Sequence, residues 1–404
     1  MAVFAIKNLN FRYPEAKENA LTDVNVQIEQ GEFVLVCGKS GCGKTTLLKN
    51  LKSVLAPYGE RSGEILFMGK NLDEVSQREQ AGNIGYVMQS PDNQIVTDKV
   101  WHELAFGVEN LGYDKETIRL RVAEMASFFG IQNWFHKHVE ELSGGQKQIL
   151  NLASILAMQP KVLVLDEPTS QLDPIAAEEF LGAIKKVNME LGTTVIMTEH
   201  RLEEALPMAD KVLVLERGRR IYYDRPEKIA NVLSGNDLFL AMPSPVRIYE
   251  QSGRMGTCPL TVCEGRKWID RYFKPSVVET PCVEEVRKAG KEKQDIVIEA
   301  KELWFRYERE LPDVIRDLSF QIQRGELFCF LGGNGTGKST TLSLLSGIRR
   351  PYRGKLSLKS KKVSMLPQNP QNLFVKDTVL ADLEEMIEGR SRSDVYKRQF
   401  LETV

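Results

Sequence analysis

Residues 33–48 read FVLVCGKSGCGKTTLL: an apolar run, a glycine-rich loop, and the start of a helical pattern. The loop, GKSGCGKT (38–45), matches G-x-x-x-x-G-K-[ST]. Between a strand and a helix this pattern predicts a phosphate-binding loop, because its glycines let successive backbone N–H groups point at phosphate oxygens. We expect Lys44 to reach the β- and γ-phosphates and Thr45 to supply a Mg²⁺ ligand.

The stretch around this loop occurs twice. Residues 11–48 reappear as residues 305–342 without a gap, so GGNGTGKS (332–339) is a second phosphate loop. The apolar run LFCFL (327–331) precedes it, and we expect a strand there as in the first copy. The chain therefore contains a tandem duplication of one domain.

The repeat divides the chain into three parts. We expect a complete first domain over 1–235, a linker over 236–295, and a second domain over 296–404. Within the linker, AMPSPVRIYEQSG (241–253) contains two prolines and is expected to be extended, and TVCEGRKWIDRYF (261–273) is expected to form a short helix. Residues 85–100 recur as 364–379, so Gln368 corresponds to Gln89, and the second domain is expected to be truncated after this segment because the 66 residues that follow Lys338 cannot hold the later motifs.

Composition restricts the class of partner. The formal net charge is −1, from 54 basic and 55 acidic side chains, so nucleic acid is not an expected partner. No apolar run reaches about 18 residues, so no transmembrane helix is expected. Cys258, Cys263 and Cys282 lack a fourth ligand at zinc spacing, which argues against a zinc site.

The run VLVLDE (162–167) predicts a buried parallel strand that ends in two carboxylates. Asp166 is expected to hold Mg²⁺ through water, and Glu167 to act as general base for the attacking water. The alternative is a pair of carboxylates on a solvated loop. The Leu/Val strand that leads into them favours the first interpretation.

Three helices are predicted near these motifs. DKETIRLRVAEMASFFG (114–130) begins at an aspartate cap and ends at a glycine. QILNLASILAMQP (148–160) follows LSGG directly, so this signature is placed at a helix N-terminus. Asp173 and Pro174 open a third helix, which Gly192 ends.

With its phosphate loop, the chain resembles the ATP-binding-cassette (ABC) ATPases through VMQ (87–89), LSGGQ (142–146), SQLD (170–173) and TEH (198–200), in this order. The resemblance covers all of the first copy and the front of the second. It implies an α/β P-loop NTPase fold, with a mixed, mainly parallel sheet, an antiparallel β subdomain and a helical subdomain, here duplicated. It also implies ATP hydrolysis with Mg²⁺.

The resemblance further implies individual roles. Gln89 would contact Mg²⁺ and the attacking water, His200 the γ-phosphate, and Asp173 the seam of a cassette pair. Tyr13 and Tyr307 would stack on adenine, although for Tyr13 alone a packed core aromatic is the alternative. The complete expected set is Lys44, Gln89, Glu167 and His200 for catalysis; Tyr13, Gly38, Lys39, Ser40, Gly41, Cys42, Gly43, Lys44, Thr45, Thr46, Ser143, Gly144, Gly145, Gln146, Asp173, Tyr307, Gly332, Gly333, Asn334, Gly335, Thr336, Gly337, Lys338, Ser339, Thr340 and Gln368 for ATP; and Thr45, Gln89, Asp166, Ser339 and Gln368 for Mg²⁺.

The signature occurs once, at Ser143, Gly144 and Gly145. Family geometry implies that it faces the γ-phosphate on the other cassette, at Gly332–Ser339. Neither composite site is then expected to be complete within the chain, and pairing of first cassettes in a homodimer is the alternative.

Within the family, QSPDNQIVTDKVWHELAFGVENLG (89–112) and MTEHRLEEA (197–205) are similar to the ATPase subunits of energy-coupling-factor (ECF) transporters, and the linker to their single-chain tandem forms. This implies import of a vitamin or transition-metal ion. It also implies a transmembrane coupling protein and a substrate-binding membrane subunit as partners, at the cytoplasmic face of the membrane. Asp92, Asn93 and Gln94 would receive coupling helices, the alternative being a solvated loop.

Two other functions remain open from the sequence. A soluble tandem-cassette translation factor also has two cassettes and no membrane span, although its linker is long, charged and helical. An ATP-binding module without turnover is the second alternative, because the later motifs of the second copy are missing.

Overall fold

The computed structural model divides into two compact units, Met1–Val283 and Glu284–Val404. Each unit is described by itself. The structure describes residues 2–233, 235–273, 295–333, 335–359, 363–367 and 374–382.

The larger sheet of the first unit has six strands, of which the inner ones are parallel. In spatial order they are β10 (Arg219–Asp224), β9 (Lys211–Glu216), β3 (Phe33–Cys37), β8 (Thr194–Thr198), β7 (Val162–Asp166) and β6 (Ile84–Val87). β3, β7 and β8 are buried along their whole length, as expected for parallel strands covered on both faces. The predicted strand over 162–167 is confirmed as β7.

A second, antiparallel sheet packs against the first and shares a hydrophobic core with it. Its strands, in spatial order, are β2 (Leu21–Glu29), β1 (Ala2–Arg12), β4 (Glu60–Phe67) and β5 (Lys70–Asn71). Side chains of β3 alternate between two cores: Phe33 and Leu35 join the core under the helices, whereas Val34 and Val36 join the core shared with the antiparallel sheet. This alternation follows from the two-residue period of a strand.

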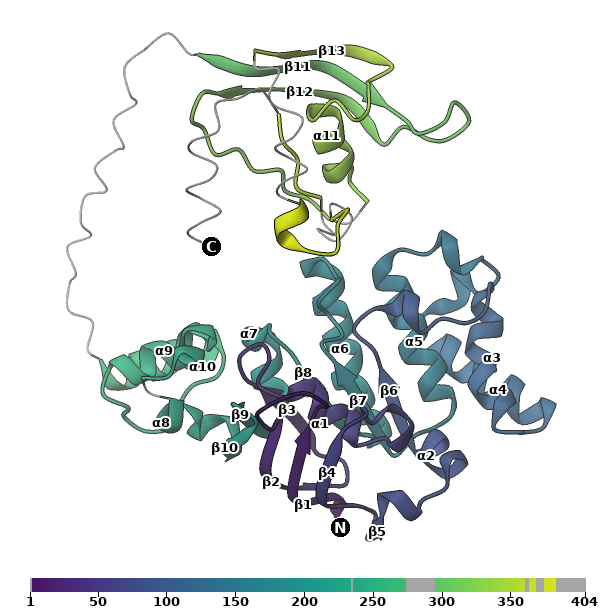
Figure 1. Cartoon of the computed structure of the whole chain (residues 1–404), viewed down its shortest axis with the longest axis vertical. Helices are drawn as coiled ribbons and strands as arrows, with labels where there is room; N and C mark the ends of the chain where they lie inside the picture. Colours follow the sequence, from purple (N-terminus) through teal and green to yellow (C-terminus); the bar gives the residue numbers. More distant parts are fainter. Residues whose placement is uncertain are drawn as a thin grey trace. The chain divides into compact units, whose positions relative to one another are not determined.

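Ten α-helices among the described residues of the first unit complete the fold (Figure 1). α3, α4 and α5 gather at one side of the sheets and α8, α9 and α10 at the opposite side. Their bounds are α1 (Lys44–Asn50), α2 (Gln77–Asn83), α3 (Val100–Asn110), α4 (Lys115–Phe128), α5 (Gly144–Ala157), α6 (Pro174–Leu191), α7 (Leu202–Ala205), α8 (Ile229–Leu233), α9 (Ser244–Gln251) and α10 (Val262–Tyr272).

The predicted helix boundaries agree with the structure where a capping residue set them. Asp114 accepts hydrogen bonds from the first turn of α4, and Gly130 beyond its end has a φ of 66°. Asp173 accepts from Ala176 N at the start of α6, and Gly192 ends that helix with a φ of 67°.

The expectation of an extended segment over residues 241–253 is wrong. Residues 244–251 form α9 rather than an extended segment, because Pro245 lies in the first turn, where its missing N–H costs no helical hydrogen bond. Tyr249 and Trp268 are buried in the main core, with ring centroids 5.6 Å apart. The first unit therefore continues beyond residue 235 and includes both helices.

The second unit repeats the antiparallel part of the first. Its sheet has the order β12 (Ile315–Gln323), β11 (Ile296–Phe305) and β13 (Arg353–Leu358), and α11 (Lys338–Leu345) follows the second phosphate loop. Register shifts between β11 and β12 fall at the same places as those between β1 and β2. Left-handed residues also recur: Asp23 and Asp317 both have a φ of 48°. The duplication therefore extends to backbone irregularities.

The strand expected at 327–331 is absent from the second unit. Leu327 and Leu331 are 91% and 92% exposed. In the first unit β3 pairs with β8 on one side and β9 on the other. Among the described residues of the second unit no strand pairs with 327–331, so an apolar run alone does not produce a strand there.

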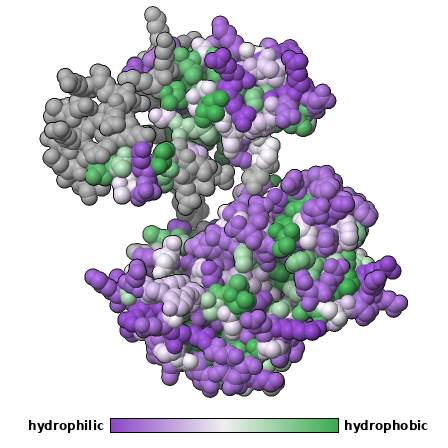
Figure 2. Space-filling model, turned by 45° about the vertical axis from the view of Figure 1, so that its right-hand side comes forward, coloured by the Kyte–Doolittle hydropathy of each residue, from purple (hydrophilic) through white to green (hydrophobic). Residues whose placement is uncertain are grey.

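No helix in the described ranges is both long and apolar enough to cross a membrane. The visible surface of the first unit is mostly hydrophilic, with hydrophobic side chains in separate groups (Figure 2).

Candidate functional site

The first phosphate loop connects β3 to α1, as its motif predicts. Gly43 has a φ of 103° at the helix N-terminus, and an added Cβ there would lie 2.5 Å from Ala20 O. Only glycine therefore fits this position. Lys44 is 5% exposed, and its ammonium donates to Gly38 O at 2.9 Å and to Lys39 O at 3.2 Å. Backbone carbonyls of the loop therefore bind the buried ammonium group of Lys44.

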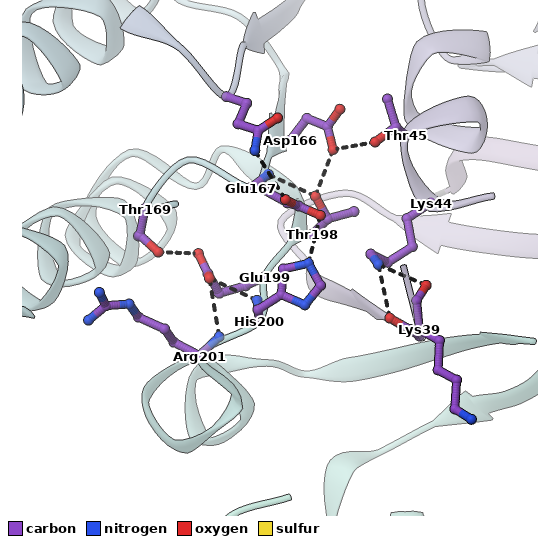
Figure 3. Close-up of polar contacts among 12 residues, drawn as sticks. Lys39, Lys44, Thr45, Asp166, Glu167, Thr169, Thr198, Glu199, His200 and Arg201 are labelled. Carbon is purple, nitrogen blue, oxygen red and sulfur yellow. Dashed lines mark hydrogen bonds and ion pairs between the residues drawn. The ribbon is translucent and has the colours of Figure 1, made fainter. Parts of the chain in front are cut away.

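Asp166 lies beside this cation loop at the end of β7. Thr45 Oγ1 donates to Asp166 Oδ1 at 3.1 Å, and Thr198 Oγ1 donates to the same oxygen at 2.9 Å (Figure 3). Tyr86 donates its hydroxyl to Asp166 Oδ2 at 3.3 Å, and burial, the largest cause, raises the Tyr86 pKa well above its ordinary value. Three hydroxyl donors therefore fix the orientation of a 7% exposed carboxylate.

This donor set fits a magnesium ion. A threonine hydroxyl and a carboxylate oxygen are hard oxygen ligands, and Mg²⁺ is bound by one or two carboxylates together with phosphate oxygens and waters. The described residues contain no cluster of three or more His, Cys, Asp or Glu side chains that could hold a metal by themselves. Thr45 and Asp166 thus fit an ion that also binds a phosphate.

Glu167 follows Asp166 and has a left-handed backbone, with a φ of 47°. A non-glycine residue in this region is strained, and such residues concentrate at functional sites. The strained peptide is held by Glu167 N, which donates to Thr198 Oγ1 at 2.8 Å. The backbone turns here so that the side chain leaves the end of the strand.

Two further predicted residues converge on this side chain. His200 Nε2 lies 2.8 Å from Glu167 Oε1, and Gln89 Nε2 donates to Glu167 Oε2 at 3.4 Å. Gln89 follows β6, Glu167 follows β7 and His200 follows β8, so three adjacent parallel strands deliver the three groups to one edge of the sheet. The structure thus brings together Lys44, Thr45, Gln89, Asp166, Glu167 and His200.

Tyr13 lies at the end of β1 next to α1. Its ring is 38% exposed and packs edge-on against Phe11, with centroids 4.9 Å apart. Its hydroxyl lies 2.9 Å from Thr46 Oγ1. Tyr307 makes the same contact with Thr340 at 2.9 Å, so the arrangement recurs in both units.

The lysine of the second phosphate loop makes the same contacts as the lysine of the first. Lys338 Nζ donates to Gly332 O at 2.8 Å and to Gly333 O at 2.6 Å, and Thr336 donates to Gly333 O. Gly337 has a φ of 88° ahead of α11. Two predicted residues, Asn334 and Gln368, lie outside the described residues.

The signature lies on the helical part of the first unit, at the start of α5. Ser143 and Gln146 form a reciprocal capping box: Ser143 N donates to Gln146 Oε1 at 3.0 Å, and Gln146 N donates to Ser143 Oγ at 3.3 Å. Both side chains are therefore used in capping the helix. A Cβ on Gly145 would lie 3.0 Å from the methyl carbon of Ala176 on α6, so this glycine permits close packing of the two helices.

Besides Tyr86, three residues of the site were not singled out from the sequence. Thr198 bonds both Asp166 and Glu167, as described above. Glu199 and Thr169 are buried and joined by a hydrogen bond of 2.7 Å. The only sequence signal for Thr198 and Glu199 was their position in TEH (198–200), directly before His200.

Comparison with known proteins agrees with this geometry. A model of the ABC transporter family matches residues 21–170 and 315–399. An ABC transporter ATP-binding protein of Bacillus cereus is 40% identical over 393 residues, covering 94% of this chain and 70% of that protein. A Bacillus subtilis protein named for HMP/thiamine import is 31% identical over 401 residues, with the same two coverages.

A solved structure gives the same result for the fold. The structure of cbiO1 from Clostridium perfringens, part of the ABC transporter complex cbiONQ, has a TM-score of 0.52 and 31% identity, and covers 59% of this chain and 97% of that one. The chain belongs to the ABC transporter family, and it is an ATP-binding cassette ATPase. The predicted fold class and ATPase activity are thereby confirmed.

Proposed function

We propose that the chain energises an importer of the ECF type, for a vitamin or a transition-metal ion. The observation that carries this proposal is the convergence of Lys44, Asp166, Glu167 and His200 at one sheet edge, in a chain related to a protein named for HMP/thiamine import. The cbiO1 relative belongs to a transporter complex, which supports membrane partners here. We propose a transmembrane coupling protein and a substrate-binding membrane subunit, at the cytoplasmic face of the membrane.

The proposed reaction assigns a role to each group. The first phosphate loop binds ATP, with Lys44 at the β- and γ-phosphates and Tyr13 at the adenine. Thr45 and Asp166 would hold Mg²⁺, which supplies charge neutralisation at the phosphates when bound. Glu167 takes the proton of the attacking water as general base, Gln89 orients that water, and His200 contacts the γ-phosphate.

Cassette pairing is part of the same proposal. Ser143 and Gly145 lie at the N-terminus of a helix, where backbone N–H groups and the helix dipole favour an anion. We propose that they act on the nucleotide of another cassette. That cassette belongs either to this chain or to a second copy paired through the first cassettes.

The loop after β6 connects a proposed docking segment with the signature helix. Asp92 accepts from Lys147 of α5 at 2.6 Å, and Asn151 of α5 donates to Pro91 O at 3.3 Å. Gln94 is not free for a partner, because its amide bonds the backbone of β6 and Met88. We propose that the coupling protein binds at Asp92 and Asn93, and that its movement reaches the signature through α5.

Val96 offers a test of docking that leaves the fold intact, because this apolar side chain is 67% exposed beside the segment. Val96→Asp should abolish co-purification of membrane proteins with the tagged chain from detergent-solubilised membranes. ATPase activity of the isolated chain should stay at the parent level. Leu120→Asp, on the 61% exposed position of α4, is the matched control and should retain the partners.

The same experiment addresses the two alternatives. Co-sedimentation of the parent chain with ribosomes, and not with membranes, would favour the translation-factor function and reject import. Binding of ATP without phosphate release, with and without membrane partners, would show a binding module instead.

A further inference from the structure

Glu199 is a carboxylate buried next to the site, 4% exposed. Its Oε1 accepts from His200 N at 2.8 Å and from Arg201 N at 3.2 Å. Its Oε2 accepts from Thr169 Oγ1 at 2.7 Å (Figure 3). Both oxygens are therefore satisfied inside the protein, which is the condition for burying a charge at low cost.

Thr169 belongs to the turn that leads from Glu167 to α6. It is fully buried, and its carbonyl accepts from Leu172 N at 3.0 Å. A second bond runs in parallel: Arg201 Nη2 donates to Leu172 O at 3.2 Å. Besides the contact between His200 and Glu167, two hydrogen bonds thus join the turn 167–172 to the segment 199–201.

We infer that Thr169 and Glu199 are a pair of positioning residues that hold the His200 backbone, and with it the imidazole, against Glu167. Neither touches the reacting atoms in the reaction proposed above, on whose roles for Glu167 and His200 this inference rests. One oxygen of the Glu199 carboxylate accepts from the backbone N–H groups of His200 and Arg201. The other oxygen accepts from Thr169, in the turn that follows Glu167. The carboxylate therefore connects the His200 backbone to that turn. Displacement of that turn therefore moves His200 as well.

The link between the two segments extends to the start of α6. The turn that carries Thr169 continues to Asp173, which caps α6. A partner that contacts the Asp173 end of the turn can shift Thr169 and thereby His200. The arrangement makes the catalytic histidine sensitive to the turn before α6, in addition to the nucleotide.

Thr169 allows a matched pair of variants. Thr169→Val keeps the side-chain shape and removes the hydroxyl, so it breaks the bond to Glu199. Thr169→Ser keeps the hydroxyl. We expect Thr169→Val to lower kcat about tenfold or more, because the imidazole of His200 is then no longer held against Glu167. Thr169→Ser should stay within about threefold of the parent kcat.

A double-mutant cycle separates positioning from general stability. The measured quantity is the ratio of affinities for a non-hydrolysable ATP analogue and for ADP, which requires no turnover. Thr169→Val and His200→Ala should each lower this ratio, and the double variant should resemble His200→Ala alone, because Thr169 acts through His200.

Three results would overturn the inference: an unchanged kcat in Thr169→Val, an equal loss in Thr169→Ser, or additive effects of Thr169→Val and His200→Ala. Glu167→Gln distinguishes failure of the parent proposal. If Glu167→Gln hydrolyses ATP at the parent rate, the assigned roles at the site are wrong. If Glu167→Gln is inactive and Thr169→Val is fully active, only the positioning pair is wrong.

Discussion

His200 and Glu167 contact each other directly, with Nε2 and Oε1 2.8 Å apart, although 33 positions separate them in the chain. Gln89 contacts the other oxygen of the same carboxylate. Both oxygens of Glu167 are thus held by side chains from neighbouring strand ends. A carboxylate fixed in this way needs little reorganisation to accept a proton from water, which suits a general base.

Glu167→Gln should bind ATP like the parent and hydrolyse it at least about 100-fold more slowly. An amide cannot accept the proton of water, whereas its shape preserves the contacts of Glu167. Phosphate release measures turnover, and equilibrium binding of a fluorescent ATP analogue measures affinity. Parent-like hydrolysis by the purified variant would reject Glu167 as the base.

Lys44→Ala should lower the affinity for ATP at least about tenfold, which corresponds to about 1.4 kcal/mol. The variant removes the buried ammonium that is expected to meet the β- and γ-phosphates. Lys49→Ala is the control, because Lys49 lies in the last turn of the same helix, α1, and outside the expected ATP-binding set. Equal loss in both variants would show that the loop is sensitive to any change and that Lys44 has no special role.

Trp268→Ala should destabilise the first unit by about 3–5 kcal/mol, because the indole is buried in the main core and donates to Met255 O at 2.6 Å. Urea unfolding measures the change. Ile269→Ala, on the 41% exposed neighbour, should cost far less. Equal, small effects would instead indicate that α10 is attached to the unit without stabilising it.

Alkylation should leave the phosphate loop unmodified at neutral pH. Burial raises the pKa of the Cys42 thiol, and it raises the pKa of Cys37 to about 12, so little reactive thiolate is present at either position. Exposed Cys263 and Cys329 should react first with N-ethylmaleimide, without loss of ATPase activity. Mass spectrometry of timed samples identifies the modified sites, and early modification of Cys42 with inactivation would contradict this expectation.

Much of the candidate site could be predicted from the sequence, because short motifs mark the places where buried strands end. VLVLDE located Asp166 and Glu167, and the capping residues of α4 and α6 located helix ends. These signals are local, and each depends on a few adjacent residues.

The parts that the sequence did not reveal depend on distant partners. The run LFCFL (327–331) has the apolar composition of a strand, yet a strand also needs neighbouring strands to pair with. FVLVC (33–37) pairs with a strand on each side, whereas no strand among the described residues pairs with LFCFL. Likewise, Pro245 suggested an extended segment, whereas packing of Tyr249 and Trp268 favours a helix. Thr169 and Glu199 lie 30 positions apart, and no motif connects them.

The left-handed backbone of Glu167 has a consequence for protein engineering. Strain of this kind costs of the order of 1–3 kcal/mol, so the placement of this carboxylate lowers the thermal stability of the molecule. Asparagine tolerates this conformation better than glutamate does. Glu167→Asn should therefore raise the resistance to heat and abolish the proposed general base, so a search for thermostable variants without an activity screen would select against that base.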